Sequence, residues 1–207
     1  NERVTLLKTH SALCTLENNP FTNKTNTKAV IYIVRDPRNL VTSFAHHYSM
    51  NIDESYNYII NEKKMLTESD FSAEDRGVAS VLGSWSKHYE SWTKIKFAPI
   101  LVVKYEDLTN DTKKSFTDIL NFLNKFTKIK IDEKKIFNTI NSCTFEKMVE
   151  KEKKEGFSES AKSKKDNKKL NFFYLGKKND WRNLLNPEIE KNLREVFSKE
   201  MKELGYI

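Results

Sequence analysis

Two short runs of apolar residues, each followed at once by charged residues, stand out along the chain. They cover residues 29–34 and 100–103, and both are rich in Val and Ile. Near-continuous β-branched runs of this length are typical of strands buried on both faces of a parallel sheet. Residues 4–7, Val-Thr-Leu-Leu, predict a third strand that leads into Lys8-Thr9-His10.

Outside these runs, apolar residues recur every three to four positions, which predicts helices. Asp36 and Pro37 suit the cap and first position of a helix that reaches Tyr48. Three further helices are predicted over residues 78–92, 112–123 and 187–204. This order of elements predicts an α/β fold: a single domain over residues 1–207, with a central parallel sheet flanked by helices on both faces. In such sheets, ligands bind at the carboxyl ends of the strands.

Residues 147–169 differ from their surroundings because lysines crowd the segment and few apolar residues interrupt it. The segment has too little apolar surface to fold alone. Two interpretations stay open, namely a mobile charged loop and a lid whose lysines close over a polyanionic ligand.

Composition narrows the class of protein. A chain of 207 residues with 38% hydrophobic residues can bury the core of one domain. Its net charge of +7 comes from lysines spread along the chain, so we expect small anionic ligands and no nucleic acid. No apolar run approaches the roughly 20 residues of a membrane span. We therefore expect no membrane insertion and a soluble, cytoplasmic protein.

Cysteines and histidines give no sign of a metal site. Cys14 and Cys143 form no paired motif, so we expect two buried, reduced thiols. The four histidines lack the spacing of a metal-binding helix, and no metal is predicted.

Arg35 stands at the carboxyl end of the first apolar run, just before the helix that Asp36 caps. Helix N-termini attract anions and arginine suits phosphate, so this position favours a phosphate site. Ser43 follows about two helical turns later and reaches the same phosphate only if the loop and helix fold around it. An ordinary ion pair of Arg35 with Asp36 or another acid is the alternative.

Lys8 and His10 project to the same side of an extended chain. A neutral imidazole can take a proton from an attacking hydroxyl, and a nearby ammonium can offset charge that develops during group transfer. A purely structural role for His10 is the alternative.

Taken in order, these segments and several others resemble the motifs of the cytosolic-type sulfotransferases, which use 3′-phosphoadenosine 5′-phosphosulfate (PAPS). The resemblance covers nearly the whole chain. The matching segments are Lys8-Thr9-His10, residues 32–43, Leu82-Gly83-Ser84-Trp85 with Trp92, Val103-Lys104-Tyr105-Glu106-Asp107-Leu108, Cys143-Thr144-Phe145-Glu146-Lys147-Met148 and residues 176–181.

The resemblance implies a P-loop-NTPase-like sulfotransferase fold and transfer of a sulfuryl group from PAPS to a hydroxyl or amine of a small-molecule acceptor, without a metal. It makes His10 the general base, with Lys8 near the transferred group. The residues that it assigns to the nucleotide are Arg35 and Ser43 at the 3′-phosphate, Tyr105, Thr144 and Phe145 along the nucleotide, and the backbone of Gly176 beside the 3′-phosphate.

The chain also departs from the family pattern. Tyr174-Leu175 replaces an Arg-Lys pair whose arginine binds the 3′-phosphate, and Asn179 replaces the glycine of the family's Gly-Asp-Trp. We expect the family's T-Y-P-K-S-G-T loop, which binds the 5′-phosphosulfate, upstream of Asn1. The acceptor and the oligomeric state stay open. Candidates to replace the lost arginine are Lys168, Lys169, Lys177 and Lys178.

Two other functions stay open beside sulfuryl transfer. One is a nucleotide-binding protein of the same fold without turnover, which the substitution at Tyr174 favours. The other is a nucleotide or small-molecule kinase, which would need a magnesium site and a phosphate-binding loop.

Overall fold

The computed structural model describes residues 4–66 and 80–207. Its contacts divide the chain into two compact units, and each unit takes two separate stretches of sequence. The first unit comprises Asn1–Arg35 and His88–Cys143, and the second comprises Asp36–Lys87 and Thr144–Ile207. One domain over residues 1–207 stays a prediction.

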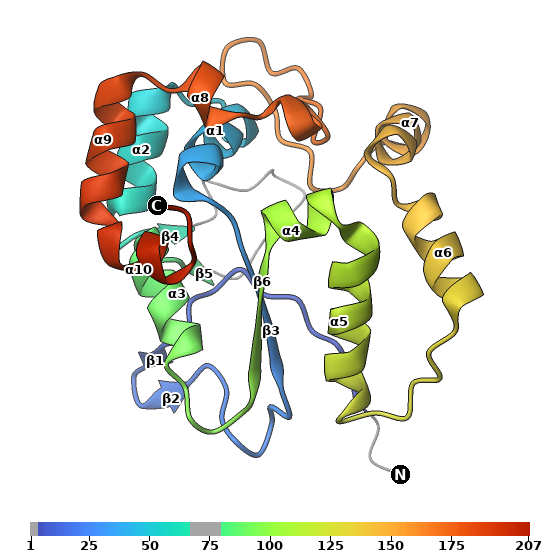
Figure 1. Ribbon diagram of the computed structural model, residues 1–207. Coiled ribbons are helices and arrows are strands. Elements are labelled where there is room, and N and C mark those ends of the chain that lie inside the picture. Colours follow the sequence, from blue (N-terminus) through green and yellow to red (C-terminus); the bar gives the residue numbers. More distant parts are fainter. Residues whose placement is uncertain (1–3, 67–79) are drawn as a thin grey trace. The chain divides into compact units, whose positions relative to one another are not determined.

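The first unit is built on two parallel strands, β3 (Val30–Val34) and β6 (Ile100–Lys104), which run side by side in Figure 1. Both strands and their parallel pairing are as predicted. Helix α5 (Thr112–Asn124) packs against β6. Tyr89, on the part of α3 (Trp85–Thr93) that belongs to this unit, packs edge-on against Tyr32 of β3. The unit also contains β1 (Thr15–Leu16), β2 (Asn19–Pro20), α4 (Tyr105–Asn110), α5 (Thr112–Asn124) and α6 (Glu133–Ser142).

The predicted first strand is wrong. Val4, Leu6 and Leu7 lie in an irregular segment and are exposed, Leu7 to 89%. A strand needs a hydrogen-bonded neighbour as well as an apolar sequence, and no sheet among the described residues includes this segment.

The helix predicted over residues 78–92 starts later than expected. Val78 lies outside the described residues, Ser80 and Val81 form strand β5, and helix α3 runs over Trp85–Thr93. Gly83 separates the two elements with φ +67°, a left-handed conformation that helices exclude. The helix-like spacing of apolar residues therefore extends over a strand and a turn that precede the helix.

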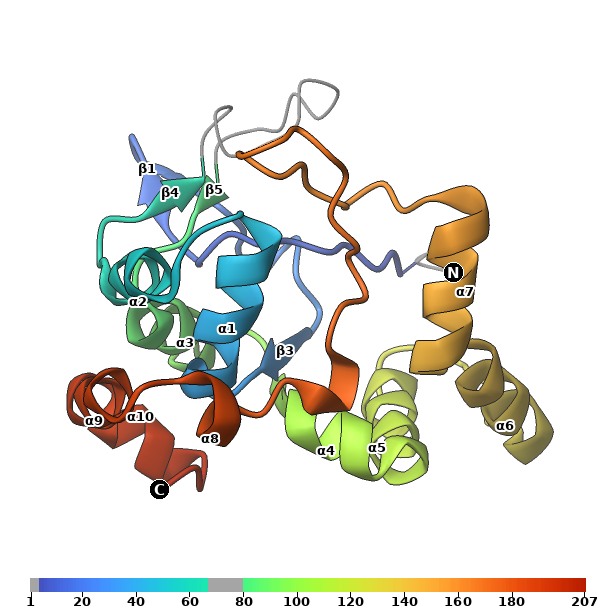
Figure 2. The same cartoon turned by 90° about the horizontal axis from the view of Figure 1, so that it is seen from above.

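The second unit is a helical layer in which α1 (Pro37–His47) packs against α2 (Ile52–Ile60), and Figure 2 shows the two side by side. The buried Ser55 hydroxyl of α2 donates to the Val41 carbonyl oxygen of α1 at 2.7 Å, which fixes this contact. Helix α3 begins in this unit. Its remaining elements are β4 (Met65–Leu66), β5 (Ser80–Val81), α7 (Phe145–Glu155), the 3₁₀ helix η2 (Gly176–Lys178), α8 (Trp181–Leu184), α9 (Pro187–Val196) and α10 (Ser198–Glu203).

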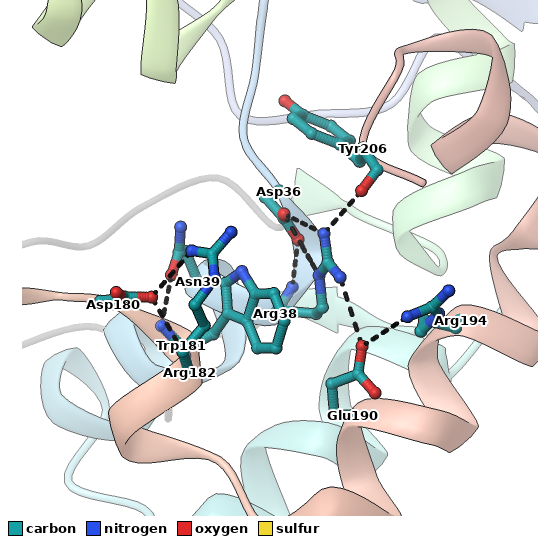
Figure 3. A network of polar contacts seen from close by, with 9 residues as sticks. All are labelled: Asp36, Arg38, Asn39, Asp180, Trp181, Arg182, Glu190, Arg194 and Tyr206. Carbon is teal, nitrogen blue, oxygen red and sulfur yellow. Dashed lines mark hydrogen bonds and ion pairs between the residues drawn. The ribbon is translucent and has the colours of Figure 1, made fainter.

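The start of α1 is fixed by a buried arginine (Figure 3). Asp36 caps the helix as predicted, since its side chain accepts a hydrogen bond from the Arg38 backbone N–H. The Arg38 guanidinium binds both Asp36 oxygens, Glu190 at 3.2 Å and the Tyr206 carbonyl oxygen at 2.9 Å. It also stacks on the Trp181 ring, 4.1 Å from the ring centre. Only 4% of Arg38 is exposed, so these contacts replace the water that the charge has lost.

The predicted C-terminal helix is two helices. Phe197, at φ −108° and ψ 19°, ends α9 and precedes α10. Ile189, Leu193 and Phe197 are buried as predicted, but Val196 is 52% exposed, so its predicted inward position is wrong. Within this unit the Phe197 ring packs on Trp85, with ring centres 5.1 Å apart.

Both cysteines are free thiols. Cys14 is half-buried and Cys143 is exposed, so the prediction of two buried thiols is wrong for Cys143. Cys143 ends α6, where its backbone N–H donates to the Ile140 carbonyl oxygen.

Candidate functional site

In the first unit, Arg35 and Tyr105 meet at the carboxyl ends of the parallel strands. Arg35 follows β3 and Tyr105 follows β6, and the register pairs Val34 with Lys104 just before them. The guanidinium carbon of Arg35 lies 4.5 Å from the centre of the Tyr105 ring. Stacking on an aromatic ring orients a guanidinium and leaves its N–H groups directed outward along its edge. Two residues assigned to the nucleotide are thus brought together at the predicted edge of the sheet.

Lys8 and His10 lie in the irregular segment before β1, and both are exposed. They are not on a strand, so the alternation that should place them on one side of an extended chain does not apply. The His10 backbone is nevertheless held, because its carbonyl oxygen accepts a hydrogen bond from His88 at 3.1 Å. The assignments of His10 as base and Lys8 as its cation stay predictions.

Tyr32 and His88 form a pair that was not predicted from the sequence. The Tyr32 hydroxyl of β3 lies 2.8 Å from Nδ1 of His88 on α3. Burial lowers the pKa of His88. The pKa of Tyr32 is raised, mainly by burial and to a smaller extent by the nearby Tyr89. Both side chains are therefore neutral near neutral pH. Periodicity placed each residue on its element, but it carries no signal for a bond between them.

In the second unit, Asn179 binds α1 at the position of Ser43. The Asn179 amide donates to the Ser43 hydroxyl at 2.8 Å and to the Asn39 carbonyl oxygen at 3.1 Å, and its oxygen accepts from the Thr42 hydroxyl. Only 8% of Asn179 is exposed. The residue that replaces the family's glycine therefore ties the turn that begins at Gly176 to the helix that carries Ser43.

Phe145, Thr144 and Gly176 form the other part of this unit's candidate site. Thr144 caps α7 by accepting a hydrogen bond from the Lys147 N–H, and Phe145 is the first residue of that helix. The Phe145 ring lies over Gly176, where an added Cβ would come within 2.8 Å of the ring. Gly176 has φ +54°, so both its conformation and its surroundings require glycine.

Tyr174, which replaces the family's arginine, stacks on His46 of α1. The two rings are 3.8 Å apart at their centres and inclined by only 4°. His46 Nε2 donates to the Asn171 carbonyl oxygen at 2.8 Å, which fixes the imidazole under Tyr174. The tyrosine thus has a well-defined place, but its neutral side chain does not supply the lost positive charge.

The lysines proposed to replace that arginine are all exposed. Lys168 forms an ion pair with Asp166 at 3.4 Å, while Lys177 and Lys178 lie in η2 beside Gly176. Lys169 lies beside Gly156. Proximity in sequence to Gly176 favours Lys177 and Lys178, and the replacement stays a prediction.

The lysine-rich segment is not one loop. Residues 147–155 belong to helix α7, so the loop interpretation is wrong for this part. Within the rest, the Ser160 hydroxyl donates to Glu152 of α7 at 2.8 Å. Just after the segment, the Phe172 N–H at 2.6 Å and the Phe173 N–H at 3.0 Å donate to the same carboxylate. Closure of residues 156–169 over a ligand stays a prediction.

Two kinds of feature are absent from residues 4–66 and 80–207. No three His, Cys, Asp or Glu side chains come together in a group that could bind a metal ion. No helix there combines the length and the apolar character that crossing a bilayer requires.

Comparison with solved structures identifies the fold. Mouse sulfotransferase SULT7A1, whose structure is described as complexed with PAP, matches with a TM-score of 0.61 at 22% identity, over 91% of this chain and 64% of that one. The likeness confirms the predicted α/β sulfotransferase fold.

Comparison of sequences identifies the family. Sulfotransferase 1B1 of Mus musculus is 26% identical over 95% of this chain, and the amine sulfotransferase of Oryctolagus cuniculus is 25% identical over 89% of it. The aligned parts make up 60% and 58% of those relatives, so this chain spans about three fifths of their length. The family model described as "Sulfotransferase domain" matches residues 1–205. The resemblance seen in the motifs is confirmed, and the chain belongs to the sulfotransferase family.

Proposed function

We propose that the protein transfers the sulfuryl group of PAPS to a hydroxyl or amine of a small-molecule acceptor. Family membership over residues 1–205 supports this reaction, and it disfavours the kinase considered above. The observation that carries the proposal is the stacked pair of Arg35 and Tyr105 at the carboxyl ends of β3 and β6, where this class of sheet binds its ligands.

In this proposal, the nucleotide is held by the residues that the resemblance assigns to it. Arg35 and Ser43 donate to the 3′-phosphate, and Tyr105, Thr144 and Phe145 line the nucleotide. The Gly176 backbone approaches the same phosphate, which the absence of a side chain allows. The bound product of the reaction is adenosine 3′,5′-bisphosphate (PAP), the compound named with the mouse SULT7A1 structure.

In the chemical step, the His10 imidazole takes the proton of the attacking acceptor. The acceptor atom bonds to sulfur as the bond from sulfur to the phosphate oxygen breaks, and PAP leaves with that electron pair. The Lys8 ammonium stabilises the negative charge on the transferred group. Positioning and charge stabilisation supply the catalysis, as in phosphoryl transfer.

We also propose a cytoplasmic location, as expected from the sequence.

A thermal-shift experiment on the full-length protein tests the nucleotide assignment. We expect PAP to raise the melting temperature much more than 5′-AMP does, because only PAP carries the 3′-phosphate. The Arg35→Gln variant should lose this difference, while Arg182→Ala, which removes an exposed arginine, should keep it. Equal shifts with both nucleotides in the unaltered protein contradict the assignment.

Turnover tests the base. His10→Ala should lower the rate of sulfuryl transfer by about 10²–10⁴-fold while PAP still stabilises the variant as it does the parent. Retained activity would assign the base to another residue.

A nucleotide-binding protein without turnover is the second candidate. The stacking of Tyr174 on His46, where the family has a cation, favours it. Strong stabilisation by PAP together with no transfer from PAPS to any phenol, alcohol or amine tested would support this function instead.

A further inference from the structure

One face of helix α3 binds the backbone of residues 10–13 at three points, all within the first unit. His88 Nε2 donates to the His10 carbonyl oxygen at 3.1 Å, and Trp92 Nε1 donates to the Ser11 carbonyl oxygen at 3.0 Å. The Leu13 N–H donates to the Ser91 hydroxyl at 3.0 Å. Residues 88, 91 and 92 follow the i, i+3, i+4 spacing that places side chains on one helical face. The path of the segment that carries His10 is therefore set by α3.

The hydrogen bonds of His88 have one consistent direction. A carbonyl oxygen can only accept, so Nε2 of His88 carries the proton that is donated to His10. In the neutral imidazole Nδ1 then has no proton, and the Tyr32 hydroxyl donates to it at 2.8 Å. The lowered pKa of His88, which burial causes, agrees with this neutral tautomer.

Tyr32 anchors this chain of bonds to the sheet. It lies in the middle of β3, where the register pairs it with Val102 of β6. Its ring also packs against Tyr89 of α3, with ring centres 5.7 Å apart. His88 thus connects the His10 backbone, through Tyr32, to the pair of strands whose carboxyl ends are followed by Arg35 and Tyr105.

We propose that His88 is the positioning residue for the general base, with Tyr32 fixing the His88 ring and His88 fixing the backbone from which the His10 imidazole projects. This inference rests on the proposed function, because it assigns His10 as the base. It explains how a base on an exposed, irregular segment is held in place, since no secondary structure holds residues 4–10. A misplacement of about 1 Å can lower a rate by about 10²-fold.

A double-mutant cycle on the full-length protein tests whether His88 acts through His10. We expect His88→Ala to lower kcat by about 10–100-fold with little change in the KM for PAPS. His88→Gln should recover most of this loss, because its amide N–H can donate to the same carbonyl oxygen. In a protein that already carries His10→Ala, His88→Ala should change the residual rate by less than about twofold. An equal loss in both backgrounds would overturn the proposal.

Thr93→Ala is the control on the same helix. The Thr93 hydroxyl donates to the Tyr89 carbonyl oxygen within α3 at 2.8 Å, so its removal perturbs the helix but not the bond to His10. We expect kcat of this variant to stay within about twofold of the parent value. A loss as large as that of His88→Ala would show a general effect of weakening α3 and overturn the specific role of His88.

Hydrogen–deuterium exchange separates failure of this inference from failure of the proposed function. His88→Ala should increase exchange at the amides of residues 11–13, and His88→Gln should not, whether or not the protein turns over PAPS. Unchanged exchange in His88→Ala overturns the inference even if the protein is an active sulfotransferase. Increased exchange in a protein without any transfer activity would instead leave the bond standing and refute the proposed function.

Discussion

Replacing Arg38 with Ala should destabilise the protein far more than replacing Arg182, although the two arginines share one aromatic ring. Both guanidinium groups stack on Trp181, at 4.1 Å and 4.6 Å from the ring centre. The Arg38 side chain is 5% exposed and binds Asp36 and Glu190, whereas the Arg182 side chain is 68% exposed and pairs with Asp180. The two arginines therefore share one ring but differ in burial and in the number of their acidic partners.

The expected loss follows from what Arg38→Ala leaves behind. Removing one partner of a buried ion pair costs about 3–5 kcal/mol, because the remaining charge stays away from water. The lower value, about 3 kcal/mol, applies here for two reasons. The Arg38 backbone N–H still donates to Asp36, and Arg194 lies 3.5 Å from Glu190. Arg182→Ala breaks an exposed pair, so it should cost less than about 1 kcal/mol.

Urea denaturation followed by circular dichroism measures both values, as the free energy of unfolding extrapolated to water. A loss of about 3 kcal/mol is large, since domains are typically stable by only about 5–15 kcal/mol. The reasoning would be refuted if Arg38→Ala and Arg182→Ala lowered the free energy of unfolding equally.

Two further predictions concern the second unit. Gly176→Ala should weaken PAP binding by about tenfold or more in calorimetric titrations, because the added Cβ would meet the Phe145 ring. The control variant Gly205→Ala has open space around its Cβ and should leave the affinity for PAP unchanged. Although partial burial opposes it, the backbone and hydroxyl donors around Glu152 lower the pKa of its carboxyl group. The stabilisation from these bonds is thus present above the usual glutamate pKa of 4.5 and is lost as the pH falls through the lower folded value. Protection of the Phe172 amide from hydrogen exchange should fall in acid, and Glu152→Gln should remove this pH dependence.

The sequence predicted those elements whose start is determined by neighbouring residues, as the helix caps show. Asp36 and Pro37 begin α1 as predicted, and Asp111 caps α5 in the same way by accepting a hydrogen bond from the Lys114 N–H. Residues 4–7 have an equally strand-like composition but stay irregular, because pairing depends on a neighbour that the local sequence does not specify. The break between α9 and α10 at Phe197 was not predicted, because the same apolar spacing continues through both helices.

In the candidate site, too, some features could be predicted from the local sequence and others could not. Arg35 and Tyr105 were predictable because each directly follows a strand, and parallel strands bring their carboxyl ends to one edge. The bonds of His88 and Asn179 were not, because each links positions far apart in sequence, 78 residues for His88 and His10 and 136 for Asn179 and Ser43. A single sequence carries no record of such pairs.

The bond between Arg38 and the Tyr206 carbonyl oxygen joins residues 168 positions apart, and this has a consequence for synthesis on the ribosome. Translation at about 5–20 residues per second delivers Tyr206 roughly 10–30 s after Arg38. During that interval the helix that begins at Pro37 is made but lacks the partners that complete its layer. Nascent chains should therefore depend on chaperones until the last helices emerge.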